Sequence, residues 1–322
     1  MEKNKFLLIG AGAITESFYL KTFCNFPDTS FVILDNNTTR IRYLREVYPD
    51  FAFSDESLES TINKNKFTGG FICLPNYLHA DYIQLFVNHG IPVLVEKPVV
   101  TTPNEFNSIV FQRESLVYVA HLRRFFESSL FLQKLIRDKA FGAVIQVDIS
   151  DGAIFGWNLQ SDYLLNKSKS GGGVLIDSGV HWIDFLIWCL GDLELIAYRD
   201  NNEGGVESEC VVAFSFSTGA GALRLSRIRN IGQFIRISFE EATLEFHLYA
   251  SDTINIRLHK SPKLEIRHVL DDNVFKAFML QITTYFSVLS HSGAHTQPVA
   301  LPDAFEAFKS VDFIHRCYES LT

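Results

Sequence analysis

The first 120 residues alternate between short apolar runs and segments whose apolar residues recur at helical spacing. The strand-like runs are 5–9, 31–34, 70–74, 92–95 and 116–120, and the helical segments are 14–25, 38–48, 78–88 and one that starts at Pro103. Strands that are apolar along their whole length are buried on both faces, and helices between them make the crossover connections. This alternation predicts an α/β fold with a doubly wound parallel sheet.

The start of the last of these helices carries its own signal. Thr102 and Glu105 have the spacing of a capping box, and Pro103 stands at the first helical position.

A glycine-rich turn joins the first predicted strand to the first helix. Gly10 and Gly12 permit a tight turn there and a close backbone approach to a pyrophosphate at a helix N-terminus. We assign Gly10, Gly12, Ala13 and Ile14 to cofactor binding. Thr15 stands where a third glycine is usual, and it adds bulk where a helix normally packs closely on a strand. A tight turn without any ligand is the alternative interpretation.

An acidic residue ends the second predicted strand. Asp35 stands where a carboxylate accepts hydrogen bonds from an adenosine ribose, and this favours NAD because a 2′-phosphate would be repelled. We therefore add Asp35 and Asn36 to the cofactor site. Arg40 joins them and keeps NADP as the alternative cofactor. Asp35 could also serve only as turn chemistry before the next helix.

The second half of the chain has a different pattern. Seven segments read as strands, several with apolar and polar residues alternating, and 274–290 and 302–319 read as helices. Alternation is typical of an antiparallel sheet with one open face. We place the domain boundary near His121, which gives a dinucleotide-binding domain over 1–121 and a second α/β domain over 122–322.

Composition narrows the class of protein. With 322 residues, 47% of them hydrophobic, the chain is long enough for two domains. Its five cysteines are scattered without a C-x-x-C pair, so we expect reduced, buried thiols, no structural metal and a cytoplasmic location. A net charge of −8 argues against nucleic acid as a partner. No uninterrupted apolar run reaches ~18 residues, so we expect no membrane span.

A second glycine-rich stretch precedes three ionisable residues. Gly171, Gly172 and Gly173 are followed by Asp177, His181 and Asp184, which are spaced i, i+4 and i+7 and would share one face of a helix. The intervening residues are strongly apolar, so this helix is expected to be buried. A carboxylate one turn from an imidazole can orient it for acid–base chemistry near neutral pH. A satisfied buried pair is the alternative.

Two further motifs follow predicted strands, at the sheet edge where ligands bind in such folds. The first is Leu74-Pro75-Asn76 with His79, and the second is Glu96-Lys97-Pro98. Together with the two glycine-rich motifs, in this order and spacing, they resemble the Gfo/Idh/MocA family of glucose–fructose oxidoreductase and inositol dehydrogenase relatives. The resemblance covers nearly the whole chain.

This resemblance implies an N-terminal Rossmann domain and a C-terminal α/β domain with a large, mostly antiparallel open sheet. It also implies NAD(P)-dependent hydride transfer between nicotinamide and a hydroxyl or ketone of a sugar, cyclitol or nucleotide sugar. The cofactor residues it adds are Leu74, Pro75, Asn76, His79, Glu96 and Lys97. The catalytic residues would be Lys97, which stabilises negative charge on the reacting oxygen, Asp177, which positions substrate, and His181, the acid/base.

Other assignments stay open at this point. Asp184 either orients His181 or has a structural capping role. Trp157 either lines the nicotinamide or sugar site or packs in the core. Arg123 and Arg124 either bind a phosphate of the substrate or form salt bridges at a helix start. A sensing regulator of the same fold and an NAD-assisted glycosidase are the alternative functions.

The resemblance also suggests a homodimer or homotetramer joined through the open face of the C-terminal sheet. The sequence argument is that a monomer would rarely expose a face with large apolar residues, here Phe214, Phe216, Leu223 and Leu225.

Overall fold

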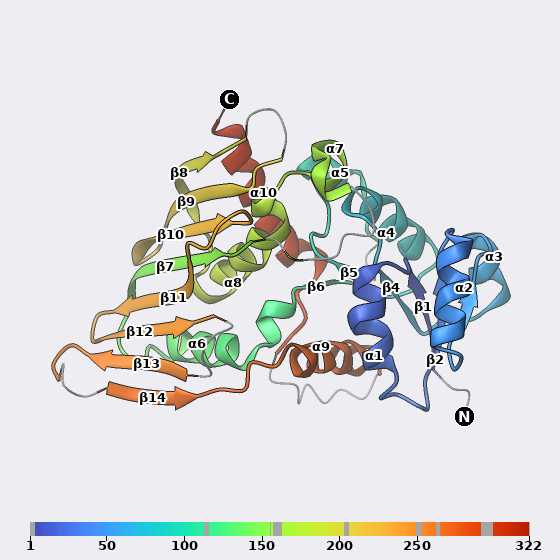
Figure 1. The fold of residues 1–322 in the computed structure, drawn as a ribbon, viewed down its shortest axis with the longest axis horizontal. Coiled ribbons are helices and arrows are strands. Elements are labelled where there is room, and N and C mark those ends of the chain that lie inside the picture. The colour runs from blue at the N-terminus through green and yellow to red at the C-terminus, as the bar shows by residue number, and fades with distance from the viewer. Residues whose placement is uncertain are drawn as a thin grey trace. The chain divides into compact units, whose positions relative to one another are not determined.

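The computed structural model describes residues 4–112, 116–154, 156, 163–202, 206–248, 253–261, 265–290 and 299–321, which form two compact units (Figure 1). The first unit runs to His121 and also includes Phe278–Phe308. The second comprises the described residues between Leu122 and Ala277 and those from Lys309 onward. The first segment of the first unit ends at His121, and the chain returns to that unit at Phe278–Phe308, so the second unit is not the continuous segment 122–322 that the sequence analysis expected. Trp157 lies outside the described residues.

The first unit contains the predicted parallel sheet, with strand order β3-β2-β1-β4-β5-β6. The strands are β1 Lys5–Ile9, β2 Ser30–Leu34, β3 Ala52–Ser54, β4 Gly69–Ile72, β5 Val93–Glu96 and β6 Val117–Ala120. The helices are a π-helical turn Thr15–Tyr19, α1 Leu20–Phe23, α2 Thr38–Val47, α3 Leu58–Lys64, a 3-10 turn Asn76–Leu78, α4 His79–Asn88 and α5 Pro103–Ser108. The order reverses between β1 and β4, as in a doubly wound dinucleotide-binding sheet. The fold class is confirmed.

The predicted helix start at Thr102 is confirmed. The Thr102 hydroxyl accepts a hydrogen bond from the Glu105 amide at 3.2 Å, and Pro103 begins α5. The Glu105 carboxylate in turn accepts from the amide of Thr101 at 2.7 Å, one residue before the position a strict capping box uses.

Aromatic rings fill the core of the first unit. Phe23 stacks on Phe31 with ring centroids 3.8 Å apart, and the Phe23 centroid also lies 5.1 Å from that of Phe71. Helix α9 (Val274–Leu289) presents the buried Tyr285, whose hydroxyl donates to the carbonyl of Pro92 at 2.9 Å. This contact explains why 278–308 belongs with the sheet rather than with its neighbours in sequence.

The second unit is built on an eight-stranded sheet with the order β14-β13-β12-β11-β7-β10-β9-β8. Every neighbouring pair is antiparallel except β7 and β10. The strands are β7 Val144–Gly152, β8 Glu194–Asp200, β9 Glu209–Phe216, β10 Gly219–Ser226, β11 Gly232–Phe239, β12 Ala242–His247, β13 Thr253–Leu258 and β14 Glu265–Val269. Seven of these were predicted, and β14 was missed.

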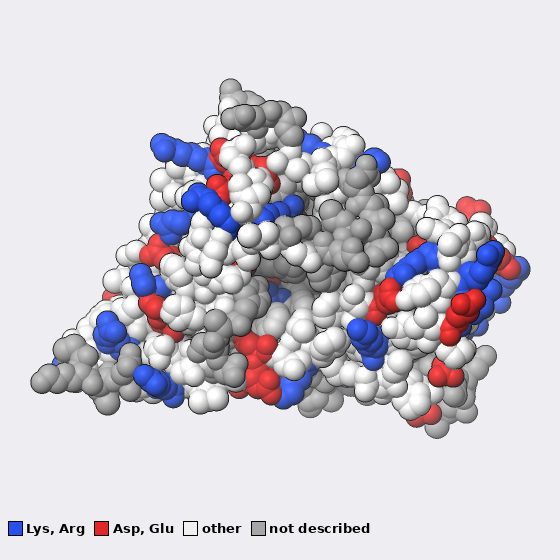
Figure 2. Space-filling view, viewed as in Figure 1, with Lys and Arg blue, Asp and Glu red and all other residues white. Residues whose placement is uncertain are grey.

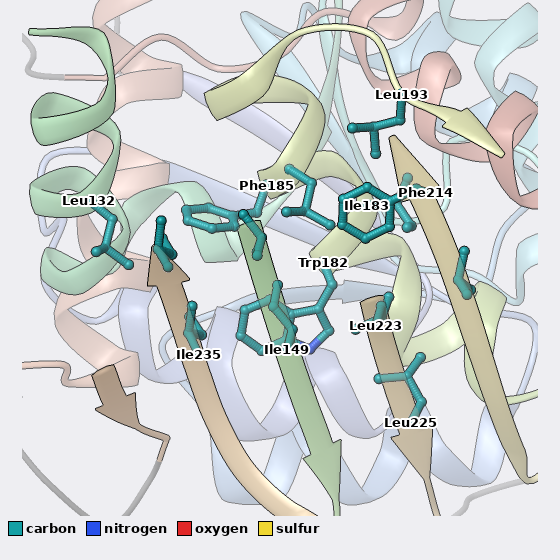
Figure 3. Packing of buried hydrophobic residues seen from close by; sticks show 14 of the residues in the cluster. Leu132, Ile149, Trp182, Ile183, Phe185, Leu193, Phe214, Leu223, Leu225 and Ile235 are labelled. Carbon is teal, nitrogen blue, oxygen red and sulfur yellow. The ribbon is translucent and has the colours of Figure 1, made fainter. Parts of the chain in front are cut away.

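One face of this sheet is covered by helices and forms the core. The covering helices are α6 Glu127–Arg137, a π-helical turn Leu175–Gly179, α8 Val180–Leu190 and α10 Ala304–Glu319. Among the described residues, the short α7 Lys167–Ser170 contributes none to this core. Figure 3 shows Trp182, Ile183 and Phe185 of α8 packed against side chains from the central strands. The run Lys167–Leu190 is long and apolar enough to cross a membrane by composition, yet 61% of its most apolar window is buried inside the fold.

The apolar residues used to argue for an oligomer lie on this covered face, so that argument was wrong. Phe214, Leu223 and Leu225 are at most 1% exposed and Phe216 is 8% exposed, because alternate residues of β9 and β10 point toward the helices. The other face carries polar pairs, including Arg224 with Asp148 at 3.5 Å and Arg236 with Glu245 at 2.7 Å. Association through the open face stays a prediction.

The cysteines are free thiols, as expected, but their burial was only partly predicted. Cys73, Cys210 and Cys317 are buried and Cys189 is partly buried, whereas Cys24, near the end of the first helix, is exposed. Within the described ranges, no three His, Cys, Asp or Glu side chains gather as a metal site. On the face drawn in Figure 2, basic and acidic side chains are interspersed.

Candidate active site

The glycine turn after β1 has the geometry that a dinucleotide fingerprint requires. Gly10 has φ +100°, and a Cβ there would lie 2.3 Å from the carbonyl oxygen of Cys73, so only glycine fits. Gly12 faces open space within 4 Å of where its Cβ would stand. The Glu16 amide donates to the Gly12 carbonyl at 3.2 Å, which starts the helix directly after the turn.

Thr15 is accommodated without opening this turn. Its side chain is fully buried, and its hydroxyl donates to the carbonyl of Gly10 at 2.6 Å. The hydroxyl therefore ties the helix to the turn where a third glycine would allow close packing. The first helical turn, Thr15–Tyr19, is π-helical, a form often found at functional sites.

Asp35 and Arg40 both contact the backbone of Ala11 in the turn, on the peptide groups before and after its Cα. Asp35 Oδ2 accepts from the Ala11 amide at 2.6 Å, and Arg40 Nε donates to the Ala11 carbonyl at 2.8 Å. The second Asp35 oxygen accepts from the Asn37 amide at 2.8 Å, and Asn36 between them is exposed. The turn interpretation of Asp35 is therefore confirmed. Its role toward a ribose stays a prediction, which these contacts permit because a carboxylate has four lone-pair positions.

His79 holds together the loops that follow β4 and β5. Its Nδ1 lies 2.7 Å from the carbonyl of Pro98 and its Nε2 lies 2.9 Å from the carbonyl of Leu74. Burial lowers the pKa of this imidazole, while the two carbonyl contacts act in the opposite direction. Asn76 is buried beside it in sequence, and Pro75 precedes the 3-10 turn. The ring of His79 is fully buried, so it links the two loops from inside the fold.

A second buried contact links the first helix to the end of β5. The Tyr19 hydroxyl donates to Glu96 Oε1 at 2.7 Å. Burial raises the pKa of Glu96. Lys97 follows and is half-buried. Lys97 lies in the first unit while Asp177 and His181 lie in the second, so the catalytic cluster of all three stays a prediction.

The second glycine loop is shaped by residues that the sequence analysis missed. A Cβ on Gly173 would lie 1.9 Å from the carbonyl oxygen of Glu207, and one on Gly172 would lie 2.2 Å from the hydroxyl of Tyr318. The buried Glu207 carboxylate accepts from the amides of Gly173 at 2.7 Å and Leu175 at 3.0 Å, and from Tyr318 at 2.7 Å. A carboxylate on free amides at a helix start is stabilising.

Glu207→Ala should therefore lower the free energy of unfolding by about 3 kcal/mol, since it leaves two buried amides and a hydroxyl without their acceptor. Glu207→Gln keeps one acceptor oxygen and should lose less. Glu194→Ala, whose side chain is 77% exposed on β8, is the matched control and should change little. Denaturant titration measures all three, and equal losses for Glu207→Ala and Glu194→Ala would contradict this role.

The helix start carries Asp177 and His181 as predicted, but not on one regular α-helix. Asp177 lies in the π-helical turn Leu175–Gly179, and His181 lies in the first turn of α8. Both are partly exposed. Asp177 forms an ion pair with Arg227, which follows β10 and also donates to the Gly173 carbonyl at 3.4 Å. Arg227 lies 50 residues from Asp177 in sequence, so no spacing pattern pointed to it.

Asp184 has a partner that neither interpretation named. Its Oδ2 accepts from Arg124 Nε at 2.8 Å and its Oδ1 accepts from Arg124 Nη2 at 2.7 Å, with both side chains at most 4% exposed. The salt-bridged interpretation of Arg124 is thus confirmed. The Arg123 guanidinium lies over the Trp182 ring, 3.4 Å from its centroid.

Both parts of the chain match models of known protein families. Residues 4–117 match the oxidoreductase family with an NAD-binding Rossmann fold, and residues 130–245 match the GFO/IDH/MocA C-terminal domain. The chain belongs to the Gfo/Idh/MocA family. Its first unit is the NAD-binding Rossmann domain, and its second unit holds the family's C-terminal domain.

Known relatives of this Gfo/Idh/MocA protein act on sugars and cyclitols. D-Glucoside 3-dehydrogenase of Escherichia coli (strain K12) is 24% identical over 191 residues, which are 57% of this chain and 53% of that enzyme, so the match spans about half of the relative. The scyllo-inositol 2-dehydrogenase (NADP(+)) of Bacillus subtilis (strain 168) is 25% identical over 278 residues, 82% of this chain and 79% of that enzyme. Levoglucosan dehydrogenase, solved with NADH and levoglucosan, has a TM-score of 0.84 at 16% identity, covers 100% and 98% of the two chains, and shows the shared fold.

Proposed function

We propose that the protein is an NAD(P)-dependent dehydrogenase or reductase that acts on CH–OH groups of a sugar, cyclitol or nucleotide sugar. The observation that carries this proposal is the fingerprint turn around Gly10 and Gly12, present in one Gfo/Idh/MocA chain with Lys97, Asp177 and His181. Lys97 follows a strand of the dinucleotide-binding sheet, and the other two begin the buried helix of the second unit.

The first unit fits a dinucleotide. The open space before Gly12 lets a pyrophosphate approach the backbone, and the helix that starts there points its free amides toward that space. Asp35 would receive the adenosine ribose. Pro75, Asn76 and Lys97 would border the nicotinamide half, on loops that His79 and Glu96 hold in place through their buried contacts.

The chain's own residues supply the acid–base chemistry. When bound, the nicotinamide accepts or supplies the hydride. In the oxidative direction, the neutral imidazole of His181 takes the hydroxyl proton of the substrate. The Lys97 ammonium donates a hydrogen bond to the same oxygen and stabilises its developing negative charge. Asp177, held by Arg227, accepts hydrogen bonds from substrate hydroxyls and positions them.

The test is a screen of cyclitols, sugars and nucleotide sugars with NAD⁺ and NADP⁺, in which reduced cofactor is followed by absorbance and products by mass spectrometry. A dehydrogenase produces reduced cofactor in step with oxidised product. Cofactor binding without turnover across the panel would favour a sensing regulator. Product release without net reduction would favour redox-assisted glycoside cleavage.

Asp35 should set a preference for NAD(H) over NADP(H), because its carboxylate repels a 2′-phosphate and accepts from a ribose hydroxyl. Asp35→Asn keeps an acceptor for the Ala11 amide and removes the charge, so it should narrow the preference without disturbing the turn. Titration of NADH and NADPH by calorimetry measures this. Tighter NADPH binding by the unaltered protein would overturn the assignment.

A further inference from the structure

A cluster of charged side chains lies beside the turn that holds Asp35. Glu16 is in the first helical turn after Gly12, and Arg40 is in the first turn of α2. Arg40 Nη2 forms an ion pair with Glu16 Oε2, and the Tyr43 hydroxyl donates to the other Glu16 oxygen at 3.1 Å. The Arg40 guanidinium also lies 5.2 Å from the centroid of the Tyr43 ring.

This cluster stands at the place where the two cofactors differ. Arg40 and Asp35 contact the backbone of the same residue, the carbonyl and the amide of Ala11. A ribose bound by Asp35 would therefore have Arg40 as its neighbouring cation. A guanidinium is well suited to a phosphate because its planar fork of donors matches phosphate oxygens.

Two nitrogens of the Arg40 guanidinium are nevertheless already engaged. Nε donates to Ala11 and Nη2 is paired with Glu16, while the side chains of Arg40 and Glu16 are only 17% and 27% exposed. Asp35, which contacts the same residue Ala11, adds a second carboxylate beside this one guanidinium, so the local formal charge is negative. A phosphate arriving here would have to compete with Glu16 for the guanidinium and would face two negative charges.

We propose that Glu16 is a cofactor-specificity residue that occupies Arg40 and so disfavours NADP(H). This inference rests on the proposed function, since it assumes that a nicotinamide dinucleotide binds at this turn. Arg40 is then a phosphate-binding residue that Glu16 keeps occupied, and part of the cofactor selectivity belongs to Glu16 on the first helical turn as well as to Asp35 after β2.

The test is calorimetric titration of NADH and NADPH with Glu16→Gln, at one fixed ionic strength because salt screens phosphate contacts. Removing the carboxylate frees Arg40, so the Kd for NADPH should fall about tenfold or more, the worth of a charge-assisted hydrogen bond. The Kd for NADH should change less than about twofold. The double variant Glu16→Gln/Arg40→Gln should lose the gain.

Glu59→Gln is the matched control, since it removes the same charge from an exposed position on α3 and should leave both constants unchanged. A Glu16→Gln variant that binds NADPH no better than the unaltered protein, or a gain that survives in the double variant, overturns the inference and leaves the proposed function standing. If the unaltered protein binds neither NADH nor NADPH, the proposed function itself fails.

Discussion

Replacing His181 with Ala should lower kcat by about 10²–10⁴, the usual contribution of a positioned acid or base. NADH affinity should stay nearly unchanged, because His181 lies in the second unit and serves the substrate. In the oxidative direction the base must be neutral, so kcat/KM falls as the pH drops through the histidine range, about 6–8. This acidic limb of the pH profile of kcat/KM should disappear in the His181→Ala variant.

The matched control is His247→Ala, which removes a half-exposed imidazole from the open face of the same unit and should leave kcat and the limb intact. A His181→Ala protein that keeps most of its activity and its limb would move proton transfer elsewhere, with Lys97 the next candidate. Loss of activity accompanied by loss of NADH binding would instead indicate a disturbed fold.

Much of the fold follows from residue pattern because each signal is local. The continuous apolar runs of the first unit place five of its six strands, and alternation places seven of the eight strands in the second. The strands that were missed are at sheet edges. β3, Ala52–Ser54, is three residues long and not fully buried, so it shows no apolar run, and β14, Glu265–Val269, ends the larger sheet.

The candidate site was predictable where its residues follow glycines or strand ends. Asp35, Lys97 and His181 were assigned to the site this way, and the structure places Asp35 and Lys97 directly after strands and His181 in the first turn of α8. The residues that contact the second glycine loop and Asp177 were not found from the sequence. Glu207 reaches the glycine loop across 34 residues, and Arg227 reaches Asp177 across 50, and such pairings depend on tertiary packing rather than on spacing.

The residue pattern also could not show what covers the apolar face of the second sheet. Alternation in Leu223 and Leu225 shows that one face is apolar, yet it does not say whether helices or a second subunit cover that face. Within the described residues, α8 supplies the cover through Trp182 and Ile183. This is why the oligomer argument failed while the strand assignment succeeded.

The buried pair of Arg124 and Asp184 should have the largest effect on stability. Asp184→Asn leaves a guanidinium that is at most 4% exposed without its carboxylate, so the free energy of unfolding should fall by about 3–5 kcal/mol. Replacing both partners with apolar residues, Arg124→Met/Asp184→Leu, should recover most of this loss, because no uncompensated charge then stays buried. Denaturant unfolding of the single and double variants gives the coupling between the two side chains.

Asp138→Asn is the control for a surface pair, since Lys134 and Asp138 are 65% and 41% exposed and exposed pairs contribute less than about 1 kcal/mol. The single and double variants of Arg124 and Asp184 also distinguish two roles for Asp184. If Asp184 acts only through Arg124, the double variant should regain activity along with stability, because α8 then again holds His181 in place. A double variant that is stable but keeps a shifted pH limb would show that Asp184 orients His181 directly, and the purely structural assignment would be wrong.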